Sequence, residues 1–290
     1  MIEGSPLKIA IASGKGGTGK TFLATNLARL MSQYYKTLLV DLDVEEPNAF
    51  IFIHGTLESS SPQFKMIPEW NEVKCTHCGI CNSSCAYHAV VQLGSYIAVF
   101  NELCHSCYAC SELCPVQALP MLPHEIGVTK TIISENLTFI ESRLQVGEEQ
   151  AVPLIHRTHA LISENGYHEF PVQIYDCPPG TSCPVVAAVR PADFVLLVTE
   201  PTPFGLNDLK LAVDTMQNLN KPLAVVINRF DIGNNDVEAY CRKMQIPVIS
   251  KIPYDRQVAV LYSNGELVNG RVNSVSASFS QIVSFMQDII

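Results

Sequence analysis

Short apolar runs alternate with helical patterns along most of the chain, and this alternation predicts an α/β fold. Strands are expected at six runs rich in β-branched residues, namely 7–13, 37–43, 172–176, 194–200, 223–228 and 247–253. After the first run, Leu23, Leu27 and Leu30 repeat at helical spacing. Further helices are expected at about 205–219 and around Val275–Met286. Strand, glycine-rich loop, helix and strand form a βαβ unit, so the sheet is expected to be parallel.

This alternation stops in the middle of the chain. Residues 54–70 are expected to form a loop, and residues 71–120 contain eight cysteines but too few apolar side chains for a core of their own. We therefore expect metal to hold that segment together. Residues 121–170 show the weakest pattern, with an expected strand at 137–144 and an expected helix at 151–162.

The predicted organisation is one large α/β domain, made of residues 1–70 and 121–290, with a small insert at 71–120. Hydrophobic residues make up 47% of the chain and charged residues 16%, which suits a large core. The net charge of −9 argues against nucleic acid as a partner, because binding its phosphates requires a basic face. No apolar run is long enough to cross a membrane and the N-terminus lacks signal-peptide organisation, so a cytoplasmic protein with reduced thiols is expected. Eleven cysteines in such a protein indicate metal binding rather than disulfides.

The segment GKGGTGKT matches the phosphate-binding pattern of glycine, four residues, glycine, lysine and a hydroxyl residue. Its glycines let successive backbone N–H groups curl around phosphate oxygens, and the helix that begins near Lys20 adds the positive end of its dipole. Lys20 is expected to reach the β- and γ-phosphates, and Thr21 is expected to ligate Mg²⁺. The predicted nucleotide-binding residues of this loop are Gly14, Gly16, Gly17, Thr18, Gly19, Lys20 and Thr21.

A second lysine in this loop, Lys15, gives the sequence KGGTGKT, which resembles the deviant Walker A motif of the MinD/ParA/nitrogenase-iron-protein class of P-loop NTPases. The resemblance implies a doubly wound, mainly parallel sheet that binds ATP or ADP with Mg²⁺ and hydrolyses ATP, slowly or on activation by a partner. It also implies an ATP-dependent homodimer in which Lys15 reaches the phosphates of the partner subunit. In the alternative, Lys15 is an exposed loop lysine of a monomer.

The resemblance extends to segments on both sides of the insert. DLDVEEPN, which begins at Asp41, is similar to the family's first switch, where Asp43 is expected to orient the attacking water and Asp41 to support the magnesium shell. Asp176 in YDCPPGT resembles a Walker B carboxylate that holds Mg²⁺ through water. Asn228 is expected to hydrogen-bond adenine, and Pro253 is expected to pack on the base. The alternative for Asp41 and Asp176 is capping of strand ends, although ligands of open α/β sheets gather at that edge.

Eight cysteines form two runs with the pattern C-x-x-C-x-x-C-x-x-x-C, and the second run repeats the first 29 positions later. This is the spacing of bacterial ferredoxins that carry two [4Fe–4S] clusters, in which the fourth cysteine of each run belongs to the other cluster. The insert is therefore expected to be a small α+β ferredoxin-like domain. The resemblance assigns the first cluster to Cys75, Cys78, Cys81 and Cys114, and the second to Cys85, Cys104, Cys107 and Cys110.

Zinc is the competing metal for these cysteines, but zinc sites usually consist of two separated C-x-x-C pairs and do not need a third cysteine in each run. The sequence departs from the ferredoxin pattern at Ala86, which stands where proline is expected after Cys85. Of the remaining cysteines, Cys241 is expected to be structural. Cys177 and Cys183 flank the segment PPG, which resembles the family's second switch. There they either bridge a dimer through a cluster or metal, or are buried small side chains.

The sequence as a whole predicts an ATPase that couples nucleotide state to electron transfer through two [4Fe–4S] clusters, with a redox or metallocofactor protein as its partner. Iron–sulfur or metallocofactor assembly or carriage is the alternative, although scaffold ATPases of the superfamily carry a C-x-x-C pair near the C-terminus and this chain has no cysteine after Cys241. A MinD-like positioning switch ranks last. The final residues SASFSQIVSFMQDII are apolar on one face but lack the lysines and arginines of a membrane-surface helix, so no stable membrane anchor is expected.

Overall fold

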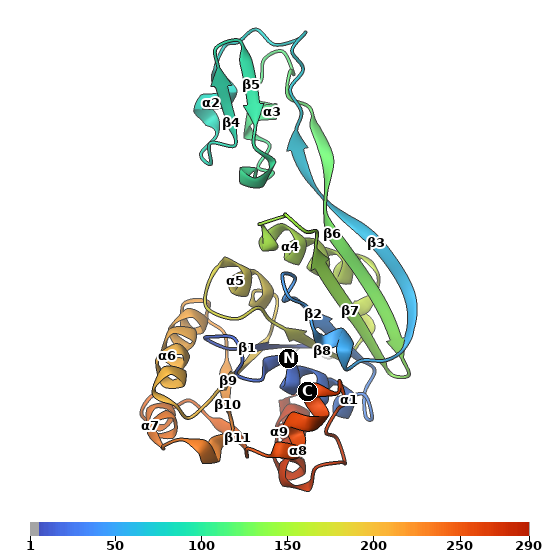
Figure 1. Cartoon of the computed structure of the whole chain (residues 1–290), viewed down its shortest axis with the longest axis vertical. Helices are drawn as coiled ribbons and strands as arrows, with labels where there is room; N and C mark the ends of the chain where they lie inside the picture. The colour runs from blue at the N-terminus through green and yellow to red at the C-terminus, as the bar shows by residue number, and fades with distance from the viewer. Residues whose placement is uncertain (1–5, 290) are drawn as a thin grey trace. The chain divides into compact units, whose positions relative to one another are not determined.

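In the computed structural model, which describes residues 6–289, the chain divides into two compact units (Figure 1). The larger one, called here the sheet unit, comprises Met1–Ser60, Thr129–Arg143 and Ile155–Ile290. The smaller one, called the cysteine unit, comprises Ser61–Val128 and Leu144–Leu154. The eight cysteines of the two sequence runs all belong to the cysteine unit.

A nine-stranded sheet runs in the order β11-β10-β9-β1-β8-β2-β7-β6-β3 through the described residues. Its strands are β1 (Leu7–Ala12), β2 (Thr37–Asp41), β3 (Thr56–Pro68), β6 (Met121–Ser134), β7 (Leu137–Leu144), β8 (Val172–Asp176), β9 (Phe194–Thr199), β10 (Leu223–Asn228) and β11 (Val248–Ile252). Every neighbouring pair from β11 to β7 is parallel, which confirms the mainly parallel α/β sheet expected from the sequence. The boundaries between the two units fall inside β3, β6, β7 and the helix Ala151–Glu164.

Helices of the sheet unit flank the strands on both sides, as a doubly wound sheet requires (Figure 1). They are α1 (Lys20–Met31), α5 (Cys183–Val189), α6 (Pro203–Asn218), α7 (Asp236–Lys243), α8 (Arg256–Ser263), α9 (Asn273–Ile289) and the larger part of α4 (Ala151–Glu164), whose first four residues belong to the cysteine unit. Leu23 and Leu27 of α1 share a buried cluster with Phe279 and Ile282 of α9 and with strand residues such as Ile174. None of the helices within residues 6–289 is both long and apolar enough to cross a membrane.

The central strands follow the apolar runs of the sequence closely. The expected bounds of β7, β8 and β10 are confirmed residue for residue, and β1, β2, β9 and β11 lie within the expected runs. Their side chains are buried on both faces; all five residues of β2 and of β8 are buried. A strand that is covered on both faces does not alternate between apolar and polar residues, so it is identified by its continuous apolar run.

The expectation of a loop at residues 54–70 is wrong, because this segment contains β3. The first half of the strand is exposed and rich in serine, so it carries no apolar run. In its second half the buried positions alternate, but two of them, Gln63 and Lys65, are polar, and Ile67 is the apolar one. Alternating burial was therefore present without the alternating hydrophobicity by which a strand is recognised.

The cysteine unit contains two short helices, α2 (Ile80–Ser84) and α3 (Ala109–Glu112), and the antiparallel hairpin of β4 (Val90–Leu93) and β5 (Tyr96–Val99). Its small core includes cysteine side chains. Val90, Ile97 and Leu119 are buried together with Cys110, and Cys75, Cys81 and Cys85 pack against them. The side chains of these cysteines are thus part of the interior that holds this unit together, whereas Cys78 and Cys107 are exposed.

Candidate functional site

The phosphate-loop segment connects β1 to α1, and two of its glycines are required by close packing. A Cβ atom at Gly14 would lie 2.1 Å from the backbone oxygen of Asp208 in α6. Gly19, directly before α1, has a φ of 99°, and a Cβ atom there would lie 2.5 Å from the Asn228 side-chain nitrogen. That same nitrogen donates a hydrogen bond of 2.9 Å to the carbonyl oxygen of Thr18. The loop is therefore held against α6 and the end of β10 in a shape that glycine permits.

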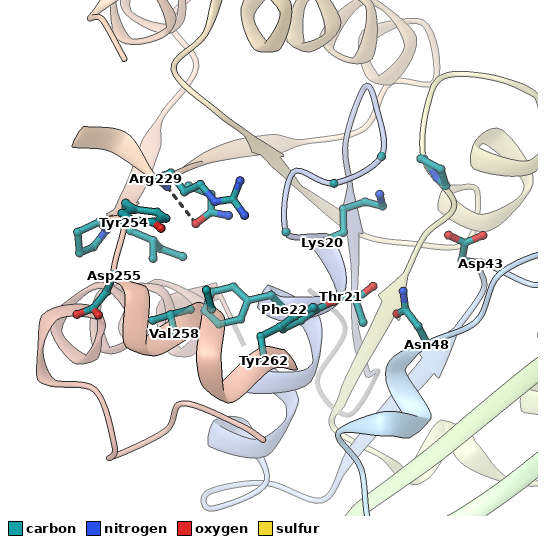
Figure 2. Close-up of a pocket in the computed structure, with 18 of the residues that line it drawn as sticks. Lys20, Thr21, Phe22, Asp43, Asn48, Arg229, Tyr254, Asp255, Val258 and Tyr262 are labelled. Carbon is teal, nitrogen blue, oxygen red and sulfur yellow. Dashed lines mark hydrogen bonds between the residues drawn. The ribbon is translucent and has the colours of Figure 1, made fainter. Parts of the chain in front are cut away.

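The loop borders a cavity of about 370 Å³ in the sheet unit, a size typical of small-molecule sites. Of the predicted nucleotide and catalytic residues, those that line it are Gly16, Gly17, Gly19, Lys20, Thr21, Asp43, Asn228 and Pro253. Lys20 and Asp43 lie toward one end of the cavity (Figure 2). Gly14, Lys15, Thr18, Asp41 and Asp176 are not among the lining residues. The structure thus brings the phosphate loop, the segment after β2 and the ends of β10 and β11 to one site.

The opposite end of the cavity is an apolar wall that sequence analysis did not identify. Phe22 of α1 and Val258 and Tyr262 of α8 contribute to it, with Tyr254 just before α8 (Figure 2). The rings of Phe22 and Tyr262 meet edge to face, with centroids 6.3 Å apart. The available sequence signal was the spacing of Val258 and Tyr262, four positions apart on one helix face, which was not used to predict α8.

Arg229 adds a cation to the cavity that sequence analysis also missed. It follows β10 directly, its φ is 52°, and its guanidinium pairs with the Glu200 carboxylate at 2.9 Å. Its backbone N–H donates to the side-chain oxygen of Asn228 at 3.0 Å. Both polar atoms of the Asn228 amide are therefore engaged within the protein, and its contact with adenine stays a prediction.

Asp176, the last residue of β8, carries the least satisfied carboxylate of the site. Both of its oxygens are buried, and neither has a hydrogen-bond partner within the described residues. Burial raises the pKa of Asp176 to about 7; the Thr21 hydroxyl and the Lys20 ammonium oppose this rise, and the Asp43 charge adds to it. An unpartnered buried carboxylate beside a phosphate-loop threonine is suited to hold a hydrated cation such as Mg²⁺.

Asp43 lines the cavity and is partly buried. Burial raises its pKa, whereas the positive charge of Lys20 lowers it. Because the charge of Lys20 acts on its pKa, Asp43 lies close to this lysine, which the sequence predicts to bind phosphate. Its predicted role, the orientation of a water molecule, requires this position beside the phosphates.

Asp41 is organised differently, although it also ends a strand. Its carboxylate accepts hydrogen bonds from the backbone N–H groups of Asp43, Asn48 and Ala49 at 3.0–3.1 Å. Burial and the neighbouring Asp176 charge raise its pKa well above the usual value. This is the geometry of the strand-end capping alternative, and it fixes the conformation of the segment that contains Asp43. A place for Asp41 in the magnesium shell stays a prediction.

Lys15, the second lysine of the loop, lies outside the cavity and is half-buried. Its backbone oxygen accepts a hydrogen bond from the Ser13 hydroxyl at 2.5 Å, which anchors the loop near its start. Within one chain, the backbone of Lys15 therefore stabilises the loop, and Lys20 is the loop lysine that lines the cavity. Its action on a partner subunit stays a prediction.

The eight cysteines of the two runs surround two separate pockets in the cysteine unit. One pocket is lined by Cys75, Cys78, Cys81 and Cys114, and the other by Cys85, Cys104, Cys107 and Cys110. These are the same two sets of four that the ferredoxin spacing predicts, with the fourth cysteine of each run in the other set. No three His, Cys, Asp or Glu side chains within residues 6–289 stand close enough together to hold a single metal ion.

Backbone geometry in the cysteine unit repeats with the same 29-residue offset as the sequence. Positive φ values recur in the pairs His77 and Ser106, Gly79 and Tyr108, and His88 and Gln117. The backbone N–H of Ala89 donates to the sulfur of Cys85 at 3.2 Å, and that of Ala118 donates to the sulfur of Cys114 at the same distance. The two halves of the unit therefore present their cysteines in equivalent ways, including an N–H donor on the fourth sulfur of each run.

Burial keeps several of these thiols protonated in the absence of metal. It raises the pKa of Cys81 and Cys104, and it raises the pKa of Cys110 to about 11. The charge of Lys65 opposes the rise at Cys104; this lysine is buried and pairs with the Glu148 carboxylate at 2.8 Å. Metal binding at such thiols must displace their protons.

The other three cysteines lie in the sheet unit. Cys177 is fully buried directly after β8, and its thiol points to the carbonyl oxygen of Tyr175 at 3.6 Å. Cys241 is also buried, whereas Cys183 is exposed at the start of α5. Burial of Cys177 matches the alternative of a small buried side chain.

Comparison with known proteins places the chain among nucleotide-binding proteins. It matches the family model described as the CobQ/CobB/MinD/ParA nucleotide binding domain over residues 9–268. An uncharacterised protein of Methanocaldococcus jannaschii is 32% identical over 261 residues, which cover 89% of this chain and 90% of that protein. An iron–sulfur cluster carrier protein of Pyrococcus horikoshii is 22% identical over 275 residues, covering 86% of this chain and 74% of the relative.

Among solved structures, the fold is similar to that of the septum site-determining protein MinD of Pyrococcus horikoshii, which was determined as a complex with Mg-ADP. The TM-score is 0.62 at 16% identity, and the superposition covers 98% of this chain and 97% of the other. At this identity the similarity extends to the fold alone.

The unpaired carboxylate of Asp176 leads to a prediction about stability. The pKa of an unfolded aspartate is about 3.9, so its rise to about 7 on folding means that the folded state loses stability as pH increases between these values. We expect Asp176→Asn to raise the free energy of unfolding at pH 8, without metal or nucleotide, by roughly 1–3 kcal/mol. The difference should nearly vanish at pH 4, where the carboxyl is protonated in the folded state and about half protonated in the unfolded state.

Urea unfolding at pH 4 and pH 8 in the presence of EDTA measures this difference. Asp288→Asn removes an exposed carboxylate from α9 and serves as the matched control that should change little. Equal stability of Asp176→Asn and the unmodified protein at pH 8 would contradict the assignment of an uncompensated buried charge.

Proposed function

The chain belongs to the CobQ/CobB/MinD/ParA nucleotide-binding family, and on that basis we propose that it is an ATP-hydrolysing iron–sulfur protein in which nucleotide state is coupled to electron transfer through two [4Fe–4S] clusters. MinD/ParA members of the family are P-loop ATPases. The observation that carries the proposal is the separation of eight cysteines into two pockets of four, in the same chain as the nucleotide-sized cavity.

For the nucleotide, the cavity offers a polar end for phosphates and an apolar end for the base. Lys20 and the backbone N–H groups of the loop bind the phosphates, and Asp43 orients the water that attacks the terminal phosphorus. The apolar side chains near Val258, together with Pro253, pack against adenine. Thr21 and Asp176 would hold Mg²⁺, Asp176 through water, and bound Mg²⁺ would neutralise charge on the phosphate oxygens.

For dimer formation, we propose that Lys15 binds the phosphates of the nucleotide held by a second subunit. The side chain stands outside its own cavity, so its charge is available beyond the site that its neighbours line. Two chains that share their nucleotides in this way would associate when ATP is bound and separate after hydrolysis. Nucleotide state would then change the association of the subunits as well as the local loop structure.

For the clusters, the eight cysteines supply sulfur ligands in the two sets that line the two pockets. The bound clusters would accept and release single electrons. The segment that Asp41 holds, after β2, leads along the chain into β3, and β3 contributes residues to both units. The chain thus runs from the segment that contains Asp43 through β3 into the unit that contains the cysteines, which gives nucleotide binding a covalent route to the clusters.

Carriage of an iron–sulfur cluster is the second candidate, and the relative named as an iron–sulfur cluster carrier favours it. Against it stands the absence of cysteine after Cys241, where the carriers' paired cysteines are expected. A MinD-like positioning role is weaker, because α9 contains no lysine or arginine with which to bind a membrane surface. Electron transfer remains the proposal because each pocket has a full set of four cysteines, as a resident cluster requires.

The cluster assignment predicts the metal content of reconstituted protein. After anaerobic reconstitution, we expect about eight iron atoms per chain. Because Cys78 and Cys107 belong to different pockets, Cys78→Ala and Cys107→Ala should each lower the content toward about four. Cys241→Ser, which alters a buried cysteine of the sheet unit, is the control and should retain the full content. Stable zinc with no reducible chromophore would contradict the assignment.

Coupling predicts that nucleotide changes the reduction potentials of the clusters. A redox titration followed by EPR, with and without Mg²⁺ and a non-hydrolysable ATP analogue, should give a shift of at least one potential. Lys20→Ala removes the phosphate-binding cation, so that variant should retain its clusters but bind nucleotide weakly and show no shift. Potentials that stay fixed in a protein that holds both clusters and nucleotide would rule out coupling and favour carriage.

The assignment of Lys15 predicts a defect that is confined to subunit association. Lys15→Ala should keep its affinity for ADP, because the side chain lies outside its own cavity, and should lose the dimer formed with the ATP analogue. Sedimentation velocity measures the association, and Lys243→Ala, which removes an exposed lysine of α7, is the control. A Lys15→Ala protein that still dimerises with the analogue would refute the role in the partner subunit.

A further inference from the structure

Trp70, the single tryptophan of the chain, lies at the pocket that the first set of cysteines surrounds. It follows β3 and packs against the small core of the cysteine unit, as Cys75 and Cys81 also do. The Tyr96 ring meets it edge to face, with centroids 5.1 Å apart and the planes at 86°. These contacts hold the indole in one orientation beside the pocket.

The indole N–H of Trp70 has no acceptor. The Nε1 atom is buried and has no hydrogen-bond partner within the described residues. Leaving a buried donor unpaired is unfavourable, and buried tryptophan nitrogens usually find an acceptor. The pocket beside it is lined by four cysteines, by the polar side chains of Thr76 and His77, and otherwise by apolar residues and a glycine, so cysteine sulfurs make up most of its side-chain acceptors.

The corresponding position in the other half of the repeat has no such donor. The Asn71 N–H donates to the Ala118 carbonyl oxygen, and the Phe100 N–H, 29 positions later, donates to the Ala89 carbonyl oxygen, each at 2.8 Å. The repeat therefore extends to this part of the chain, and the position that corresponds to Trp70 is occupied by Val99, whose side chain cannot donate a hydrogen bond. The second pocket has polar lining residues of its own, Tyr87, His105 and Tyr108, but none of them stands at the position of Trp70 in the repeat.

We infer that Trp70 donates an N–H···S hydrogen bond to a sulfur of the cluster held by Cys75, Cys78, Cys81 and Cys114, and thereby makes that cluster easier to reduce. The inference rests on the proposed presence of the clusters. Reduction adds one electron from a donor to the cluster and so increases the negative charge on its sulfur atoms. A fixed donor stabilises the reduced form more than the oxidised form, and hydrogen bonds to sulfur are among the factors that set cluster potentials.

The test removes the N–H donor. Incorporation of benzothienylalanine, which keeps the shape of the indole, at this one tryptophan position, or Trp70→Phe, which also shortens the side chain, should make reduction of one cluster about ten-fold less favourable. That is a shift of about −59 mV for a one-electron couple. The potential of the second cluster should stay unchanged. Val99→Ile, at the corresponding position of the other pocket, is the matched control and should leave the first cluster's potential where it was.

A second measurement uses the unmodified side chain, so it does not depend on a variant that folds. Protein labelled with ¹⁵N-indole tryptophan carries one labelled indole, and its reduced form should show a ¹⁵N hyperfine coupling by ENDOR. No coupling, or equal potentials for the benzothienylalanine protein and the unmodified protein at full iron content, would overturn the hydrogen bond and leave the cluster proposal intact. Absence of iron after reconstitution would overturn both.

Discussion

The parallel pairing of β1 and β2 on either side of β8 determines where the chemistry of the sheet unit can occur. In this register Ile11 lies opposite Asp176, and Asp176 lies opposite Asp41. Hydrogen bonds continue beyond the strand ends, from Leu42 N–H to the Asp176 carbonyl and from Gly180 N–H to the Ser13 carbonyl. The phosphate loop and the segments after β2 and β8 therefore begin at one edge of the sheet, as ligand sites of open α/β sheets do.

This arrangement forces two carboxylates into a buried position at neighbouring strand ends. The protein satisfies one of them internally, since Asp41 has three backbone N–H donors from the following segment. It leaves the other, Asp176, without a hydrogen-bond partner among residues 6–289. Two strand-end aspartates of similar sequence context thus differ in their hydrogen bonding, and only Asp176 has both carboxylate oxygens unpaired in this part of the chain. Backbone hydrogen bonding, which no residue pattern encodes directly, accounts for the difference.

A feature of the molecule could be predicted from sequence where its signal lies in one continuous stretch of residues. The buried strands and the phosphate loop have such signals, and their positions along the chain are confirmed. Strand β3 was missed because polar Gln63 and Lys65 occupy buried positions, and Lys65 is tolerated there through its ion pair with Glu148, more than eighty positions away. The apolar wall of the cavity was missed for a similar reason, since Phe22 and Tyr262 come together only through the packing of α1 and α8. Residues defined by long-range contact give no local pattern.

In the cysteine unit, by contrast, a local sequence repeat specifies the backbone conformation but not the side chains that surround each pocket. Its two halves share turn conformations and N–H···S contacts at a constant offset, even where the repeat places Tyr108, with a φ of 64°, opposite Gly79. The side chains around the two pockets differ, since the buried Lys65 acts on Cys104 in one and Trp70 lies at the other. If both pockets hold clusters, as proposed, these differences in charge and hydrogen bonding give the two clusters different surroundings and therefore different reduction potentials, even though the backbones that hold them are equivalent.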